Sequence, residues 1–94
     1  MIPVTLEKLA QATGGQIIAG DPGMTVSALR TDSREDCSGA MFVPLSGENF
    51  DGHDYTGAAV KNGAAGFFWS RAEAPPQFPC AAVVRVADTL KAYQ

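Results

Sequence analysis

The chain has 94 residues, of which 46% are hydrophobic and 18% are charged, and its net charge at pH 7 is −3. This composition is typical of one small globular domain and excludes a disordered or disulfide-dense protein. Ten acidic residues outnumber seven basic ones, which argues against the clustered positive charge that nucleic acids and anionic membranes attract. We therefore expect no nucleic acid and no membrane among its partners.

Two further features favour a cytoplasmic protein without a metal. The amino terminus has no basic segment followed by an apolar run, and 18 apolar residues never occur in a row. Cys37 and Cys80 form no CxxC motif, and with one histidine in the chain the usual ligands of a zinc site are missing. We expect both cysteines to be reduced thiols.

Helices and strands are predicted to alternate along the chain. The first helix has apolar residues at helical spacing over 6–13, with Thr5 as its amino-terminal cap and Gly14-Gly15 at its end. A short strand is expected at 16–20, a turn at 21–23, and a second strand from Met24 that runs out into polar residues.

The second half of the sequence continues the alternation. MFVPL at 41–45 indicates a strand, in which Pro44 marks an edge or a strand end. A helix is predicted from Tyr55 to Asn62, two buried strands at 66–70 and 80–86, and a last helix capped by Asp88. We expect an α/β fold, a small layered sandwich with a mixed sheet.

Two polar segments are candidates for a site. TDSR, at 31–34, follows a strand end, where α/β proteins often place ligand-binding residues, although Asp and Ser also form simple turns. SGENFDGHDY, at 46–55, holds His53 without an activated serine or cysteine beside it, so we interpret His53 as structural or close to a ligand. Asp51 and Asp54 stand at a helix start, where capping is the simpler role.

Bulky and basic residues near the later strands have simple interpretations too. Phe67, Phe68 and Trp69 could stack on bases, but a strand buried on both faces is the better interpretation. Arg71 and Arg85 follow or end strands and are expected to be solvated.

Four motifs in succession carry a resemblance to a known family. TDSR, GAMFVPLSGENFDGHDY, AVKNGAAGFF and VVRVADTLKAYQ resemble the amino-terminal domain of the Mur ligases, cytoplasmic ATP-dependent enzymes that add amino acids to the peptidoglycan precursor. GENFDGH most resembles the members that join D-alanyl-D-alanine to UDP-N-acetylmuramoyl-tripeptide. The members that add the third amino acid are the alternative, and a freestanding module without catalytic activity is another.

The resemblance implies a role for the two polar segments. In the family this domain grips the uridine diphosphate end of the substrate, so residues 1–94 would form a single substrate-binding domain that contacts UDP-N-acetylmuramoyl-tripeptide and the parent enzyme's central domain. The implied uridine site has no catalytic residue and no metal ligand, and it comprises Thr31, Asp32, Ser33, Arg34, Ser46, Gly47, Glu48, Asn49, Phe50 and Asp51.

The sequence lacks the glycine-rich loops GxxxxGK[ST] and GxGxxG that hold nucleotide phosphates. The resemblance implies that ATP and magnesium bind in a central domain outside these residues, which is followed by a third domain. We therefore expect no cofactor in this chain and no catalysis by these 94 residues alone.

Overall fold

A computed structural model describes residues 3–45, 51–78 and 81–93. Its main element is a five-stranded mixed sheet in the order β2-β7-β6-β5-β4. The strands β4 (Ala28–Arg30), β5 (Ala40–Phe42), β6 (Gly66–Trp69) and β7 (Ala82–Arg85) are parallel, and β2 (Gln16–Ala19) joins the edge antiparallel to β7. The expected α/β sandwich with a mixed sheet is confirmed.

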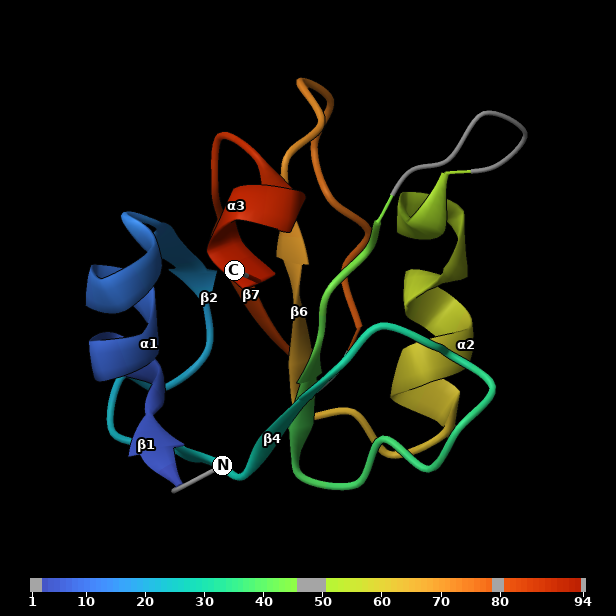
Figure 1. The fold of residues 1–94 in the computed structure, drawn as a ribbon, viewed down its shortest axis with the longest axis horizontal. Coiled ribbons are helices and arrows are strands. Elements are labelled where there is room, and N and C mark those ends of the chain that lie inside the picture. The colour runs from blue at the N-terminus through green and yellow to red at the C-terminus, as the bar shows by residue number, and fades with distance from the viewer. Residues whose placement is uncertain (1–2, 46–50, 79–80, 94) are drawn as a thin grey trace.

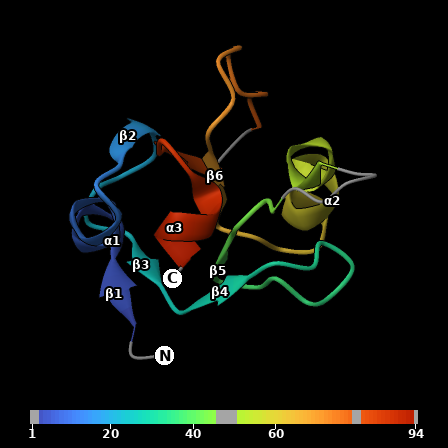
Figure 2. The same ribbon diagram turned by 45° about the horizontal axis from the view of Figure 1, so that its top comes forward.

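Helices cover both faces of this sheet, so that three layers are visible in Figure 1, with α1 (Leu6–Thr13) on one side and α2 (Thr56–Lys61) on the other. A two-stranded sheet of β1 (Val4–Thr5) and β3 (Thr25–Val26) lies beside α1, as Figure 2 shows. The last helix, α3 (Thr89–Tyr93), packs on the side of α1 and contributes Ala92 to that core.

Alternating side chains of the central strands divide the core into two clusters. The cluster under α1 contains Phe68 and the cluster under α2 contains Phe67 and Trp69. These three aromatic residues are at most 3% exposed, because successive side chains of a strand point to opposite faces. The prediction of a strand buried on both faces is confirmed.

Local signals determine the first helix as predicted. The Thr5 side chain accepts a hydrogen bond from the Lys8 amide at 3.2 Å, and Gly14 ends the helix with a φ of 69° in the left-handed region. The last helix is likewise capped, since Asp88 Oδ1 accepts from the Leu90 amide at 2.9 Å. Cys37 is a buried free thiol, and Cys80 lies outside the described residues.

Two strand predictions differ from the structure. The strand expected from Met24 is divided into β3 and β4, which belong to different sheets, because the amide and hydroxyl of Ser27 both donate to the Gly39 carbonyl at 2.9 and 3.0 Å. The strand expected at 41–45 is β5, which ends at Phe42, so Pro44 lies beyond a strand end and not at a sheet edge.

Candidate functional site

A pocket of about 240 Å³ lies where strands β4 and β5 end. Two segments that are distant in the sequence line it, 31–34 and 52–55, together with Phe42 of β5. The lining residues are Thr31, Ser33, Arg34, Phe42, Gly52 and Tyr55. The carboxyl ends of parallel strands are the edge at which open α/β sheets bind ligands. The structure thus brings three of the four residues of TDSR next to the turn that follows Asp51.

The TDSR segment forms a compact turn around one carboxylate. Asp32 Oδ1 accepts hydrogen bonds from the backbone amide of Arg34 at 2.9 Å and from its Nε at 3.0 Å, and Asp32 Oδ2 accepts from Arg34 Nη2 at 3.0 Å. These side-chain bonds to Arg34, followed by the backbone bond, lower the pKa of Asp32 to about 2. The turn predicted as the simpler interpretation is therefore present, and it holds an exposed guanidinium at the pocket.

The same segment is anchored to the end of helix α2. Ser33 is 6% exposed, and its carbonyl accepts a hydrogen bond from Asn62 Nδ2 at 2.6 Å. The Asn62 carbonyl in turn accepts from the Cys37 amide at 3.0 Å. Asn62 thus bonds to both Ser33 and Cys37, which are 4 residues apart, and so fixes the TDSR segment, the first wall of the pocket.

The second wall is η1, a single 3₁₀ turn over Gly52–Tyr55. The Gly52 amide donates to the Leu45 carbonyl at 2.8 Å, and a Cβ at position 52 would lie 2.6 Å from that oxygen and 2.7 Å from the Leu45 nitrogen. Glycine is therefore required for the close approach of the two backbones. Tyr55, which is 47% exposed, also lines the pocket.

Phe42, Gly52 and Tyr55 line the pocket without being among the residues of the implied uridine site, although Gly52 and Tyr55 fall in the candidate segment 46–55. Tyr55 was interpreted as part of a helix face and Phe42 as part of a strand. The sequence offered one signal for Tyr55: it stands two residues after His53 in a polar segment. No sequence signal distinguished Phe42, which is 1% exposed, from the other core residues.

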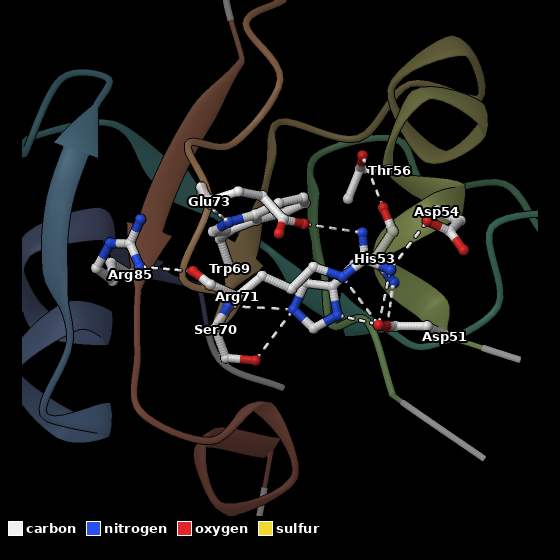
Figure 3. A network of polar contacts seen from close by, with 9 residues as sticks. All are labelled: Asp51, His53, Asp54, Thr56, Trp69, Ser70, Arg71, Glu73 and Arg85. Carbon is white, nitrogen blue, oxygen red and sulfur yellow. Dashed lines mark hydrogen bonds and ion pairs between the residues drawn. The ribbon is translucent and has the colours of Figure 1, made fainter. Parts of the chain in front are cut away.

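A polar network, shown in Figure 3, fastens η1 to the residues that follow β6. The ring of His53 is buried, with Nδ1 2.6 Å from Asp51 Oδ1 and Nε2 3.1 Å from the Ser70 amide nitrogen. A backbone amide can only donate, so Nε2 accepts and the proton lies on Nδ1. His53 is thus a neutral bridge between Asp51 and Ser70.

Arg71 is the second bridge of this network. Its Nη2 donates to Asp51 Oδ2 at 2.7 Å and to Asp54 Oδ1 at 2.9 Å, and its Nη1 donates to Glu73 Oε1 at 3.2 Å. The hydrogen bonds to Asp51, and after them those to Asp54, raise the pKa of Arg71. The guanidinium also lies 5.7 Å from the Trp69 ring centroid, within the range of a cation–π contact.

Several expectations for these residues are corrected by the network. Arg71 and Arg85 are not simply solvated, because Arg71 is paired with carboxylates and Arg85 Nη1 donates to the Arg71 carbonyl at 2.7 Å. Asp51 does cap the turn, accepting from the His53 amide at 3.0 Å, but it also carries the ion pair. Asp54 binds Arg71 and is no cap of α2, whose N-cap position is Tyr55.

His53 is structural, as predicted, and adjoins a pocket. The amides of His53 and Asp54 already bond to the Asp51 side chain and carbonyl, so they are not available to an anionic ligand. The predicted site residues Ser46, Gly47, Glu48, Asn49 and Phe50 lie outside the described residues, and their assignment stays a prediction.

Neither a metal site nor a membrane span is found in the part of the chain that the structure describes. Within residues 3–45, 51–78 and 81–93, no three side chains of His, Cys, Asp or Glu are grouped to hold a metal ion. No helix in these ranges is long and apolar enough to cross a bilayer.

Comparison with known proteins agrees with the fold and the motifs. Residues 25–91 match the family model described as "Mur ligase family, catalytic domain". UDP-N-acetylmuramoyl-tripeptide–D-alanyl-D-alanine ligase of Escherichia coli is 39% identical over 76% of this chain, and that of Bacillus subtilis is 35% identical over 100%. UDP-N-acetylmuramoyl-L-alanyl-D-glutamate–2,6-diaminopimelate ligase of Synechococcus is 38% identical over 89%.

The solved structures agree with these relatives. A crystal structure of MurF from Acinetobacter baumannii superposes with a TM-score of 0.81 at 34% identity, covering 98% of this chain and 20% of that one. The chain spans 15% of the E. coli, 21% of the B. subtilis and 17% of the Synechococcus protein. Its fold is that of the amino-terminal domain of MurF, and the chain belongs to the Mur ligase family.

Proposed function

We propose that this chain is the uridine-diphosphate-recognising domain of an ATP-dependent ligase of peptidoglycan synthesis. The parent enzyme would add D-alanyl-D-alanine to UDP-N-acetylmuramoyl-tripeptide, as the names of the E. coli and B. subtilis relatives state for those proteins. The observation that carries the proposal is the pocket that TDSR and η1 line together.

The lining of the pocket suits a pyrimidine nucleotide. A uracil edge needs both donors and acceptors, which Thr31, Ser33 and the neighbouring backbone offer, and the Tyr55 ring offers a face for stacking. The Arg34 side chain is 88% exposed and keeps donors available for a phosphate. We include the segment from Ser46 to Asp51 in the proposed site, as the family resemblance implies.

The size of the pocket supports partial recognition by this domain. Its volume of about 240 Å³ is below the roughly 300–1,000 Å³ of most small-molecule sites, so it suits one ring and not a whole nucleotide sugar. We propose that a central domain outside this chain holds much of the diphosphate, together with ATP and magnesium. Weak binding, with a free energy of about −4 to −6 kcal/mol, is then expected.

The chain alone is proposed to be inactive. It has no loop of the GxxxxGK[ST] type, and the described pocket holds no nucleophile activated by a base, because the one histidine is bonded to Asp51 and Ser70. We expect no ATP hydrolysis and no amide bond formation above a blank. Turnover that a substitution in this chain abolished would contradict this part of the proposal.

A parent enzyme that adds the third amino acid is the second candidate. The diaminopimelate ligase of Synechococcus is nearly as similar to this chain as the E. coli D-alanyl-D-alanine ligase, at 38% against 39% identity. The two candidates share the uridine end of their substrates and differ in the amino acid or dipeptide that they add. Assaying the full-length enzyme with D-alanyl-D-alanine and with diaminopimelate decides between them.

Calorimetry with UMP and AMP tests the proposed recognition. We expect a dissociation constant for UMP in the high-micromolar to millimolar range and weaker binding of AMP, because the pocket is small for a purine. Ser33→Ala should weaken UMP binding by about 1 kcal/mol if its hydroxyl bonds the base. Equal affinities for UMP and AMP would contradict the proposal.

A further inference from the structure

Within the turn η1, the first and last residues line the pocket and the two residues between them are bonded elsewhere. Gly52 and Tyr55 line the pocket, whereas His53 and Asp54 between them are bonded to residues that follow strand β6. Resting on the function proposed above, we propose that Arg71 and His53 are positioning residues for uridine binding. Neither is among the residues that line the pocket, and both act by holding η1 in place.

The side-chain bonds that hold Asp51 and η1 come from two residues directly after β6. Arg71 donates to Asp51 through Nε at 2.9 Å and Nη2 at 2.7 Å, and Nη2 also reaches Asp54. His53 is bonded to the amide of Ser70, the residue before Arg71, and to its hydroxyl at 3.0 Å. Two consecutive residues after β6, Ser70 and Arg71, therefore hold three of the four residues from 51 to 54, as Figure 3 shows.

The residues that hold η1, Ser70 and Arg71, follow a strand residue that is buried in the core. Trp69, which is 3% exposed, lies edge-on to the His53 ring with centroids 4.9 Å apart, and its Nε1 donates to the Glu73 carbonyl at 2.9 Å. Arg85 donates to the Arg71 carbonyl from the neighbouring strand. The network thus connects η1 to the hydrophobic core and not to another surface loop.

Stability alone is a weak reason for such an arrangement. The side chains of Arg71, Asp51 and Asp54 are 27%, 33% and 64% exposed, and ion pairs in contact with solvent contribute little to folding. The bonds instead fix an orientation, since Arg71 Nε and Nη2 both donate to Asp51 Oδ2 while His53 holds the other oxygen, Oδ1, of the same carboxylate. This fixed geometry sets where Gly52 and Tyr55 stand.

Substitutions of Arg71 and His53 that remove a contact or retain part of it provide the test. Arg71→Met removes the bonds of this side chain to Asp51 and Asp54, and Arg71→Lys keeps the charge without the guanidinium geometry. His53→Asn retains a donor near Nδ1, and His53→Gln retains an acceptor near Nε2. Glu73→Gln is the matched control, because Glu73 binds the same Arg71 but lies outside η1.

The readouts are the dissociation constant for UMP and hydrogen exchange of the amides of residues 52–55, both measured well below the unfolding temperature of each variant. We expect Arg71→Met to weaken UMP binding about three- to tenfold and to speed exchange in η1, with smaller effects of Arg71→Lys and of both His53 variants. Glu73→Gln should leave both readouts as in the wild type.

The outcomes separate this inference from the function on which it rests. A wild-type chain that does not bind UMP rejects both. A wild-type chain that binds UMP, with folded Arg71 and His53 variants that bind it equally well, rejects the positioning role alone. Should Arg71→Met fail to fold, Arg71→Lys and His53→Asn decide, and a loss confined to the melting temperature in them would show a merely structural role.

Discussion

Tyr55 combines exposure with a fixed place in the pocket wall. Tyr55 is 47% exposed and ends the turn η1, in which His53 and Asp54 are bonded to residues that follow β6. A ring in this situation offers a flat surface that need not be ordered when a ligand binds, so that little entropy is lost.

Replacing Tyr55 tests the stacking contact. Tyr55→Ala should weaken UMP binding by about 1 kcal/mol, roughly fivefold, because base–aromatic stacking is worth about 1–3 kcal/mol at exposed platforms. Tyr55→Phe keeps the ring and should bind UMP nearly as the wild type does. Equal loss in both variants would instead assign the effect to the hydroxyl.

The Asp32 carboxylate gives the clearest pH dependence. Its hydrogen bonds from Arg34 lower its pKa from 3.8 to about 2, so the pair stabilises the folded turn above about pH 3.8 and loses this effect as the pH falls towards 2. The carboxyl carbon shift of Asp32, followed by NMR, should have its midpoint near pH 2. In Arg34→Gln the midpoint should return towards 3.8, and a wild-type midpoint already near 3.8 would contradict the contact.

At the scale of elements, the turn η1 depends on one glycine. A Cβ at position 52 would lie 2.9 Å from Pro44 Cα as well as meeting the backbone of Leu45, and backbone atoms cannot move aside cheaply. Position 57 in α2 is different, because a Cβ there would be 3.5 Å from the nearest atom of Phe78, an ordinary contact.

The two glycines therefore make a matched pair of substitutions. Gly52→Ala should lower the free energy of unfolding by about 1–3 kcal/mol, whereas Gly57→Ala should raise it by about 0.5–1 kcal/mol, since alanine favours a helix. Urea unfolding of both variants measures these changes. Equal changes of the same sign would show that the approach of Gly52 to Leu45 does not constrain the turn.

Element by element, sequence reasoning succeeded where the signals are local. Thr5, Gly14 and Asp88 act on residues within four positions, and the helix ends they indicated are present. The strand from Met24 was wrong because its division depends on Gly39, which is 12 residues from Ser27. Such a contact has no trace in the hydrophobic pattern of either segment.

The polar network was missed for the same reason. Asp51 and Arg71 are 20 residues apart, and His53 and Ser70 are 17 apart, so each residue alone suggested a cap, a loop residue or a solvated charge. Only the parallel arrangement of the strands places the end of β6 beside the turn after β5. The positions of Arg71 and Tyr55 at the site could not follow from periodicity.

At the scale of the whole molecule, the alternating pattern was enough for the fold class. The helix between the strands at 41–45 and 66–70 requires a crossover, and such a crossover pairs its two strands in parallel, as β5 and β6 are. The order of four motifs identified the family, which the matched model and relatives confirm. The pattern did not imply that β2 is the antiparallel edge strand, since six further strands and helices lie between β2 and its partner β7 along the chain.

Two pocket walls lie at the carboxyl ends of the parallel strands, and each wall is bonded to another part of the fold. Asn62 fixes the TDSR wall and Arg71 fixes η1, and the pocket lies between them. If this pocket recognises uridine, a ligand must disturb both walls together and leave the opposite edge of the sheet unaffected. Recognition of the base also requires that a purine nucleotide disturb the walls less than a pyrimidine nucleotide does.

Backbone amide shifts measured by NMR during titration with UMP, and separately with AMP, test this most directly. We predict that UMP moves the signals of residues 31–34 and 46–55 more than those of the rest of the chain, and that AMP moves them less. Shifts that cluster at Phe67–Trp69, or that are the same for AMP as for UMP, would contradict the assignment of this pocket to uridine.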